Sequence, residues 1–277
     1  MATKKTTSTA VTKWDEELAR RAKVATKMEQ NTGTGGQYFS IAGGTLSFND
    51  QPMPDNQMAV VVVDAVLENA YYDQPFDPKG EAVPPKCFAL ARDEADLAPH
   101  EQVVKAKLAE HDVCKGCPQN EFGTARIGRG KACKNTRRLA LLPAGRFLKD
   151  GTFEPIEDPD HYAGAPLGIL RIPVTSIVPY ANWVRQVEQV MHRPPLGVFC
   201  KVACIKDPER QVALTFETLA KVPDELLGAL FQRADNDTEG LLMQPYPEPE
   251  DKPARGKAAP AKRARGKAAP AKRARKY

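Results

Sequence analysis

The sequence predicts a β-rich α+β fold, a small barrel or sandwich with peripheral helices, rather than alternating strands and helices. The pattern of apolar residues favours this class, and the chain length sets the number of domains. Most apolar runs alternate with period two or are rich in β-branched and aromatic side chains, whereas three segments have helical periodicity. The chain has 277 residues, of which 42% are hydrophobic, so it is long enough for one large domain or two small ones.

The N-terminal third sets out the first elements in order. Residues 1–12 are rich in Lys, Thr, Ser and Ala, and we expect them to be disordered. Apolar residues recur at helical spacing over 14–30, which predicts a helix. Two short strands at 37–41 and 45–48 then flank Gly43-Gly44, a pair that favours a tight hairpin.

The next element is a long β-rich run from Met58 to Tyr72. Its length predicts a curved, bulged strand rather than a flat one. Alternation places Val60, Val62, Asp64 and Glu68 on the same face as Tyr72. Further strands are expected at 87–91, 138–142, 167–174, 198–205 and 211–218, with a turn at 206–210 and helices at 182–191 and 224–233.

The C-terminal part differs from the body in charge. We expect a folded body over 13–235, a proline-rich linker over 236–253 and a disordered tail over 254–277 that repeats a basic decapeptide. The tail holds ten Lys and Arg and no acid, which leaves 30 basic and 35 acidic residues in the rest of the chain. The body is therefore mildly acidic, and overall charge does not explain what it binds.

Composition also excludes some locations. No window of 18 apolar residues is present, so we expect no spanning helix and no membrane partner. The N-terminus lacks the apolar run of a secretory signal, so the expected compartment is the reducing cytoplasm.

Clustered cysteines in a reducing compartment indicate a metal site. The predicted ligands are Cys87, Cys114, Cys117 and Cys133, around a polar insertion at 93–136. A Cys-x-x-Cys turn directs two sulfurs to one ion, and two further cysteines complete a tetrahedral site. Zinc is the favoured metal, and an iron–sulfur cluster is the alternative. A third interpretation is that the four cysteines are unrelated buried thiols that bind no metal.

Four other residues bear on this site. His100 and His111 lie nearby in sequence and could replace Cys87 as a ligand, although ordinary surface histidines explain them as well. Cys200 and Cys204 share one strand face, and we expect them to pack in the core.

Basic residues surround the predicted metal site, with Glu121 as the one acid among them. They form a candidate phosphate-contacting surface, with a solvated loop as the alternative: Lys115, Arg126, Arg129, Lys131, Lys134, Arg137 and Arg138. Among the aromatic residues of the β region, Tyr38 and Tyr72 are the best outward-facing candidates for stacking on unpaired bases. Core packing is the alternative for each.

These features resemble the zinc-containing single-stranded-DNA-binding proteins of tailed bacteriophages. The resemblance rests on the β-rich body, the Cys-Lys-Gly-Cys-Pro knuckle at 114–118, the nearby basic residues and the tail, and short segments similar to phage proteins span roughly 14–145. It implies an OB-type barrel that carries a metal-bound insertion, and a location in the host cell cytoplasm. The basic tail is a difference, because that family usually ends in an acidic tail that recruits partners.

Three functions are expected in order of preference. The first is a non-catalytic single-stranded-DNA-binding protein of phage replication or recombination, with replication proteins as further partners. The second is a histone-like DNA-condensing protein that binds duplex DNA through its tail. The third is an iron–sulfur nuclease, for which Asp64 and Glu68 are the paired carboxylates.

Overall fold

The computed structural model describes residues 18, 20–21, 37–75, 83–205 and 212–247. Of the predicted helix at 14–30 it describes Leu18, Arg20 and Arg21, which are helical. The expected disordered N-terminus, the turn at 206–210 and the basic repeat lie outside these residues. No helix in the described part of the chain is long and apolar enough to cross a membrane.

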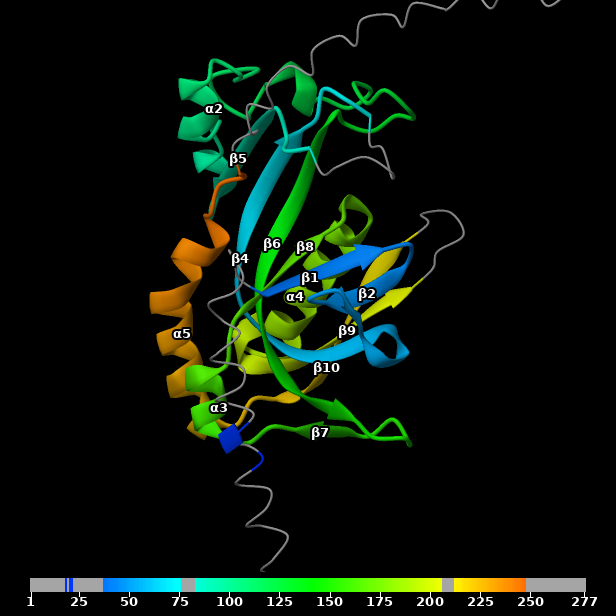
Figure 1. The fold of residues 1–277 in the computed structure, drawn as a ribbon, viewed down its shortest axis with the longest axis vertical. Helices are drawn as coiled ribbons and strands as arrows, with labels where there is room; N and C mark the ends of the chain where they lie inside the picture. The colour runs from blue at the N-terminus through cyan, green and yellow to red at the C-terminus, as the bar shows by residue number, and fades with distance from the viewer. Residues whose placement is uncertain (1–17, 19, 22–36, 76–82, 206–211, 248–277) are drawn as a thin grey trace, which may run out of the picture. The chain divides into compact units, whose positions relative to one another are not determined.

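One mixed sheet dominates the described residues and confirms the strand-rich α+β class. Neighbouring strands in this sheet follow the order β10-β9-β4-β6-β8-β1-β2-β3, and in addition β5 pairs with β4 and β7 pairs with β6 (Figure 1). The strands are β1 (Gln37–Ala42), β2 (Thr45–Phe48), β3 (Gln51–Pro52), β4 (Gln57–Tyr71), β5 (Cys87–Ala91), β6 (Cys133–Phe147), β7 (Phe153–Pro155), β8 (Gly168–Ile172), β9 (Val198–Ile205) and β10 (Ala213–Lys221). The helices are α2 (Glu101–Lys105), α3 (Pro159–Gly164), α4 (Ile177–Met191) and α5 (Asp224–Leu242).

The predicted glycine hairpin is present between β1 and β2. Ala42 pairs with Thr45, so the loop consists of Gly43 and Gly44 alone. Their φ angles are 58° and 79°, in the left-handed region that glycine enters without a Cβ clash. The turn thereby fixes the register of the two strands.

Strand β4 is bulged, as its length predicts. Its register against β6 shifts between Ala59 and Val60 and again between Val62 and Asp64. The second bulge reverses the alternation, because Val62 packs in one core and Val63 and Val66 pack in the other. Asp64 therefore does not share a face with Val62, so the prediction is wrong in joining Val60 and Val62 to the face of Asp64. The predicted shared face of Asp64 and Glu68 is present, because Asp64 bonds to Thr238 of α5 and Glu68 bonds to Tyr246 just beyond that helix.

The bulged strands curl the sheet into a half-barrel (Figure 1). Asn56 bridges the curl, since its amide donates to the Gly44 carbonyl at 2.8 Å and to the Cys204 carbonyl at 2.7 Å. The inner face packs on α4 through Trp183, which is 3% exposed and donates from Nε1 to Thr218 Oγ1 at 3.0 Å. This arrangement encloses the first core.

The first core also contains Cys200 and Cys204, which confirms their predicted packing role. A second core lies on the outer face of β4 and β6, where α3 and α5 cover it. Figure 1 shows α5 running beside β4, with no described helix over β1 and β8. On this outer side Tyr38 of β1 and Arg171 of β8 are exposed, whereas Ile169 of β8 is buried.

Several predicted boundaries need correction. Helix α5 continues to Leu242 and Tyr246 is buried, so the compact unit ends at Tyr246 and the linker does not begin at 236. Strand β6 already begins at Cys133, so the insertion spans 93–132 rather than 93–136. The short helices α2 and α3 and the strands β3 and β7 were not predicted, since each is too short to show a periodic pattern.

Candidate metal cluster and nucleic-acid surface

The first two cysteines belong to the main sheet. Tyr71, at the end of β4, pairs with Cys87 on β5 and with Cys133 on β6. Residues directly opposite in antiparallel strands point to the same side, and neighbouring strands are about 4.8 Å apart. The two cysteines therefore face the same side of the sheet with the β4 strand between them.

The other two cysteines lie on a tight turn above that side. Cys117 N–H donates to the Cys114 carbonyl at 3.4 Å, and Asn120 donates to the same carbonyl at 3.1 Å. Gly116 has φ of 76°, which the turn requires and a side chain would oppose. Cys114 N–H donates to the Leu97 carbonyl at 3.0 Å and ties the turn to the segment after β5.

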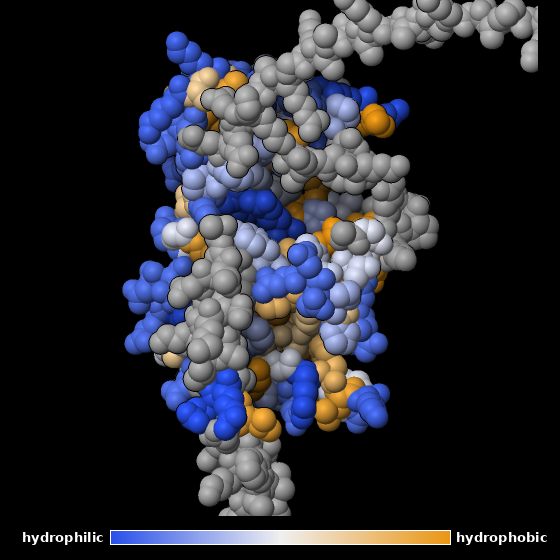
Figure 2. Space-filling view, viewed as in Figure 1, coloured by the Kyte–Doolittle hydropathy of each residue, from blue (hydrophilic) through white to orange (hydrophobic). Residues whose placement is uncertain are grey.

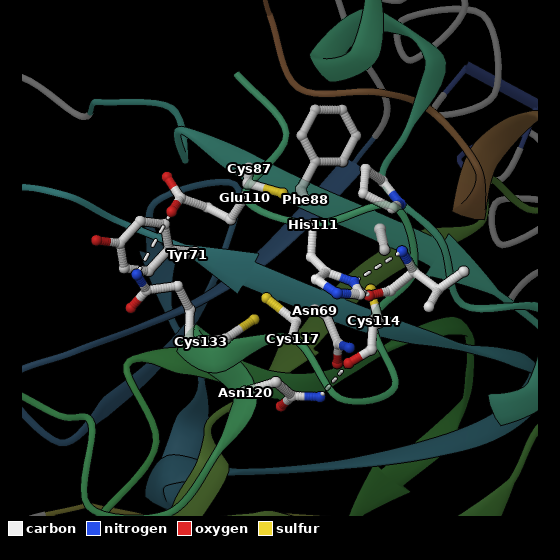
Figure 3. A pocket seen from close by; sticks show the side chains of 14 residues that line it. Asn69, Tyr71, Cys87, Phe88, Glu110, His111, Cys114, Cys117, Asn120 and Cys133 are labelled. Atoms are coloured by element: carbon white, nitrogen blue, oxygen red, sulfur yellow. Dashed lines mark hydrogen bonds between the residues drawn. The ribbon is translucent and has the colours of Figure 1, made fainter. Parts of the chain in front are cut away.

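All four cysteines line one cavity of about 20 Å³, which Figure 3 shows with the sulfurs of Cys87, Cys117 and Cys133 pointing into it. That space is about the size of a single water molecule. Four thiols are also the donor set that zinc prefers in structural sites. The sequence prediction that these residues share a site therefore has geometric support.

The four thiols around this cavity do not form a metal coordination shell in the arrangement described. Among the residues that the structure describes, no group of three or more His, Cys, Asp or Glu side chains is gathered closely enough to hold a metal ion. Zinc bonds to sulfur are about 2.3 Å long, which places ligand sulfurs about 3.8 Å apart. Binding zinc would require the thiols to move inward, and the identity of the metal stays a prediction.

Burial controls the protonation of these thiols. It raises the pKa of Cys133 to about 12, and the neighbouring thiols of Cys114, Cys87 and Cys117 contribute to this rise. Burial also raises the pKa of Cys87 and of Cys114. As placed, these three side chains are neutral thiols near pH 7, and a bound metal cation would favour their thiolate forms.

The two histidines have different positions. His111 lines the cavity, and its Nδ1 lies 2.9 Å from the Val113 carbonyl. His100 does not line it, because its ring stacks on Phe88 with centroids 4.8 Å apart. Its Nδ1 accepts from Gln102 N–H at 3.3 Å and caps α2. His100 is therefore a helix cap in this structure rather than a candidate ligand.

The predicted basic surface divides by exposure. Lys115, Arg129 and Lys134 are exposed. Lys131 is half-buried, donates to Asn120 Oδ1 at 3.3 Å and lies over the Phe122 ring. Arg126 is exposed and donates to the Asp73 carbonyl, and burial lowers the pKa of the half-buried Arg137.

Arg138 must be removed from the predicted DNA-binding set. It is 1% exposed, and its Nε donates to the 2% exposed carboxylate of Glu68 at 2.7 Å. Its Nη1 donates to the carbonyls of Leu242 at 3.1 Å and Gln244 at 2.5 Å. The hydroxyl of Tyr246 donates to the same Glu68 oxygen at 2.7 Å. Arg138 thus fastens the end of α5 to the sheet.

The carboxylates expected for a nuclease are also held by protein groups. Asp64 accepts two bonds from Arg92 at 2.9 and 2.8 Å and one from Thr238 Oγ1 at 2.6 Å. Glu68 is buried against Arg138. Neither carboxylate is free to hold a catalytic metal ion in this arrangement, so the structure gives the nuclease reading no support.

The two predicted stacking tyrosines are both exposed, each at 41%. Tyr38 pairs with Ile169 across the parallel β1–β8 register, so it shares the outer side with Arg171, two residues further along β8. Tyr72 directly follows β4, and burial raises the pKa of its hydroxyl. The Arg171 guanidinium lies 4.6 Å from the Tyr246 ring centroid. We call Tyr38, Tyr72 and Arg171 the tyrosine face.

Arg171 was missed by sequence reasoning. Its side chain is 47% exposed, and its Nε is 3.6 Å from Glu68 Oε1. The available signal was a single arginine inside the otherwise apolar strand 167–174, which indicates an outward position. Figure 2 shows hydrophilic side chains gathered in the middle of this side of the molecule.

The comparisons with known proteins give no relative. No protein family, curated protein or solved structure matches this chain.

Proposed function

We propose that the protein is a non-catalytic single-stranded-DNA-binding protein and that the tyrosine face is its binding surface. The observation that carries the proposal is the pair of 41% exposed tyrosines with an exposed arginine on the outer side of the sheet. Aromatic rings stack on unpaired bases of any sequence, and a guanidinium pairs with phosphate. The function in phage replication or recombination follows from the sequence resemblance.

The strand order supports an OB-type arrangement as part of this proposal. Strands β4, β6 and β8 are antiparallel neighbours, α4 follows, and β9 returns to pair with β4 before β10. An OB barrel is a five-stranded Greek-key barrel that binds oligonucleotides on strands two and three and on the loop between strands one and two. In that correspondence, β6 and β8 are strands two and three, and the cysteine insertion is the loop. One difference is that β1, not β10, lies beside β8.

The proposed metal has a structural role in this scheme. Zinc held by the four cysteines would join the Cys114–Cys117 turn to β5 and β6, and so fix the insertion to the sheet. The acidic body then attracts DNA through local groups rather than net charge. The exposed Lys115, Arg129 and Lys134 of the insertion and β6 supply that local charge.

The test is a pair of titrations with single-stranded and duplex DNA of equal length, for the full chain and for a chain truncated after Pro253. Tyr72→Ala and Tyr38→Ala should each weaken single-strand binding by roughly 5- to 150-fold, since a stacked base contributes about 1–3 kcal/mol. Phe231→Ala, at an aromatic residue that is 51% exposed on α5, is the matched control and should change little.

The outcomes separate the competing functions. Stronger binding of single strands by the truncated chain, lost in the tyrosine variants, supports the proposal. Equal affinity for both forms of DNA contradicts it. Loss of all binding on truncation would make the tail the nucleic-acid module, as the DNA-condensing alternative requires.

A further inference from the structure

The insertion carries a well-defined loop at residues 121–132, which we call the tip loop. Gly123 N–H and Ala125 N–H both donate to the Gly130 carbonyl at 3.0 Å. Thr124 Oγ1 donates to the Glu121 carbonyl at 2.7 Å and accepts from Ala132 N–H at 3.0 Å. These bonds close the base of the loop and leave its end projecting.

Apolar side chains stand on this projecting loop. Ile127 is 93% exposed and Phe122 is 79% exposed, the two highest values among the large hydrophobic residues that the structure describes. Figure 2 shows an apolar spot among hydrophilic residues at the upper right, over the insertion. Exposing such side chains costs free energy, so their position on a hydrogen-bonded loop indicates a contact with another molecule.

The charge around the loop selects an anionic partner. Between residues 115 and 134 the chain has five basic residues and one acid, Glu121. Arg126 and Arg129 flank Ile127 and are exposed. The ammonium of Lys131 lies 5.1 Å from the Phe122 ring centroid. An apolar tip inside a basic ring matches a nucleic acid, in which apolar base faces lie between phosphates.

The loop is attached next to the tyrosine face. Arg126 donates to the carbonyl of Asp73, the residue after Tyr72. A strand stacked on Tyr72 would therefore run toward the tip loop, so the loop meets whatever continues that strand.

We propose that the tip loop is a wedge that opens duplex DNA where it joins a single strand, with Ile127 inserted at the first base step. Isoleucine and phenylalanine are among the side chains that proteins insert between base steps, where they unstack the bases. At a junction the terminal pair is stacked on one side only, so it opens most easily. This activity rests on the proposed single-strand binding and adds helix destabilisation to it.

The experiment uses the full chain and a DNA with a single-stranded dT extension leading into a duplex. 2-Aminopurine in the first duplex pair fluoresces when it unstacks. Wild-type protein should raise this fluorescence, and Ile127→Ser should reduce the rise by about tenfold, the order expected when one apolar wedge is removed. Val190→Ser is the matched control, because Val190 is 68% exposed on α4, away from the insertion.

Affinity for a dT oligonucleotide without duplex is measured in parallel. The wedge is supported if Ile127→Ser keeps that affinity within about twofold and loses the fluorescence rise, and Phe122→Ser should act in the same direction. An undiminished rise in Ile127→Ser overturns the wedge, while absent dT binding by the wild type overturns the proposed function instead. Binding of the loop to vesicles of anionic lipid, lost in Ile127→Ser without any effect at the junction, would assign it to a membrane and also overturn the wedge.

Discussion

Replacing Arg138 tests the placement of this residue inside the fold rather than on the DNA-binding surface. Arg138→Met keeps much of the side-chain volume but removes the charge and the hydrogen bonds. Glu68 then stays buried, at 2% exposure, with Tyr246 and Thr136 as hydrogen-bond donors. The Leu242 and Gln244 carbonyls lose the donor that the guanidinium supplied.

Removing one partner of a buried ion pair costs about 3–5 kcal/mol, because the remaining charge has lost its compensation. Here Arg171 lies 3.6 Å from Glu68 and can compensate in part, so the lower end of that range is expected. Glu68→Gln combined with Arg138→Met should recover part of the stability, since the unpaired charge is then gone.

The assay is urea unfolding, followed by the fluorescence of Trp183, which is buried in the first core. Arg129→Met is the control at an exposed arginine, and its unfolding free energy should stay within about 0.5 kcal/mol of the wild type. The reasoning is refuted if Arg138→Met is as stable as the control and instead lowers the salt dependence of DNA binding by about 0.7, the slope for one neutralised single-strand phosphate.

Freshly purified protein should contain one zinc per chain by elemental analysis, and Cys117→Ser should lose it; less than half an equivalent in the wild type would count against the site. Burial lowers the pKa of His100, so the folded chain prefers the neutral ring; stability is full above about pH 6.5 and is lost as the pH falls through the lowered pKa. His100→Asn keeps a capping acceptor but has no titrating ring, so its melting temperature should fall less than that of the wild type between pH 7.5 and pH 5. An equal fall in both proteins would contradict this prediction. Truncation after Pro253 should make DNA binding less dependent on salt. The slope of log affinity against log salt concentration should decrease by about 0.7 for each single-strand phosphate that the tail neutralises in the full chain. An unaltered slope would show that the tail neutralises none.

Sequence patterns located most of the sheet because local rules decide those elements. The Gly43-Gly44 turn follows from the glycine pair, and β9 has the bounds that its apolar run predicts. The length of β4 indicated a bulge but not its place, since a bulge depends on the partner strand. The sequence alone therefore could not show that Asp64 and Val62 lie on opposite faces of β4.

The candidate site shows the same division. Spacing alone grouped the four cysteines, because a Cys-x-x-Cys turn and two flanking cysteines are close in sequence. Arg138 looked like one more member of a basic run, but its partner Glu68 lies 70 positions earlier in the chain. Long-range pairing of that kind leaves no local pattern, which is also why Arg171 was not identified.

The placement of Cys87 and Cys133 in strands has a consequence for modularity. A zinc finger carries its full ligand set within one excisable segment. Here half of the candidate ligands belong to β5 and β6, and β4 between them continues for 15 residues into both cores. The insertion cannot be transplanted as a domain, and removing 93–132 would leave two orphan thiols on the parent sheet. The tip loop can vary in length without disturbing the sheet, but the strands and the cysteine turn must be kept together as one unit.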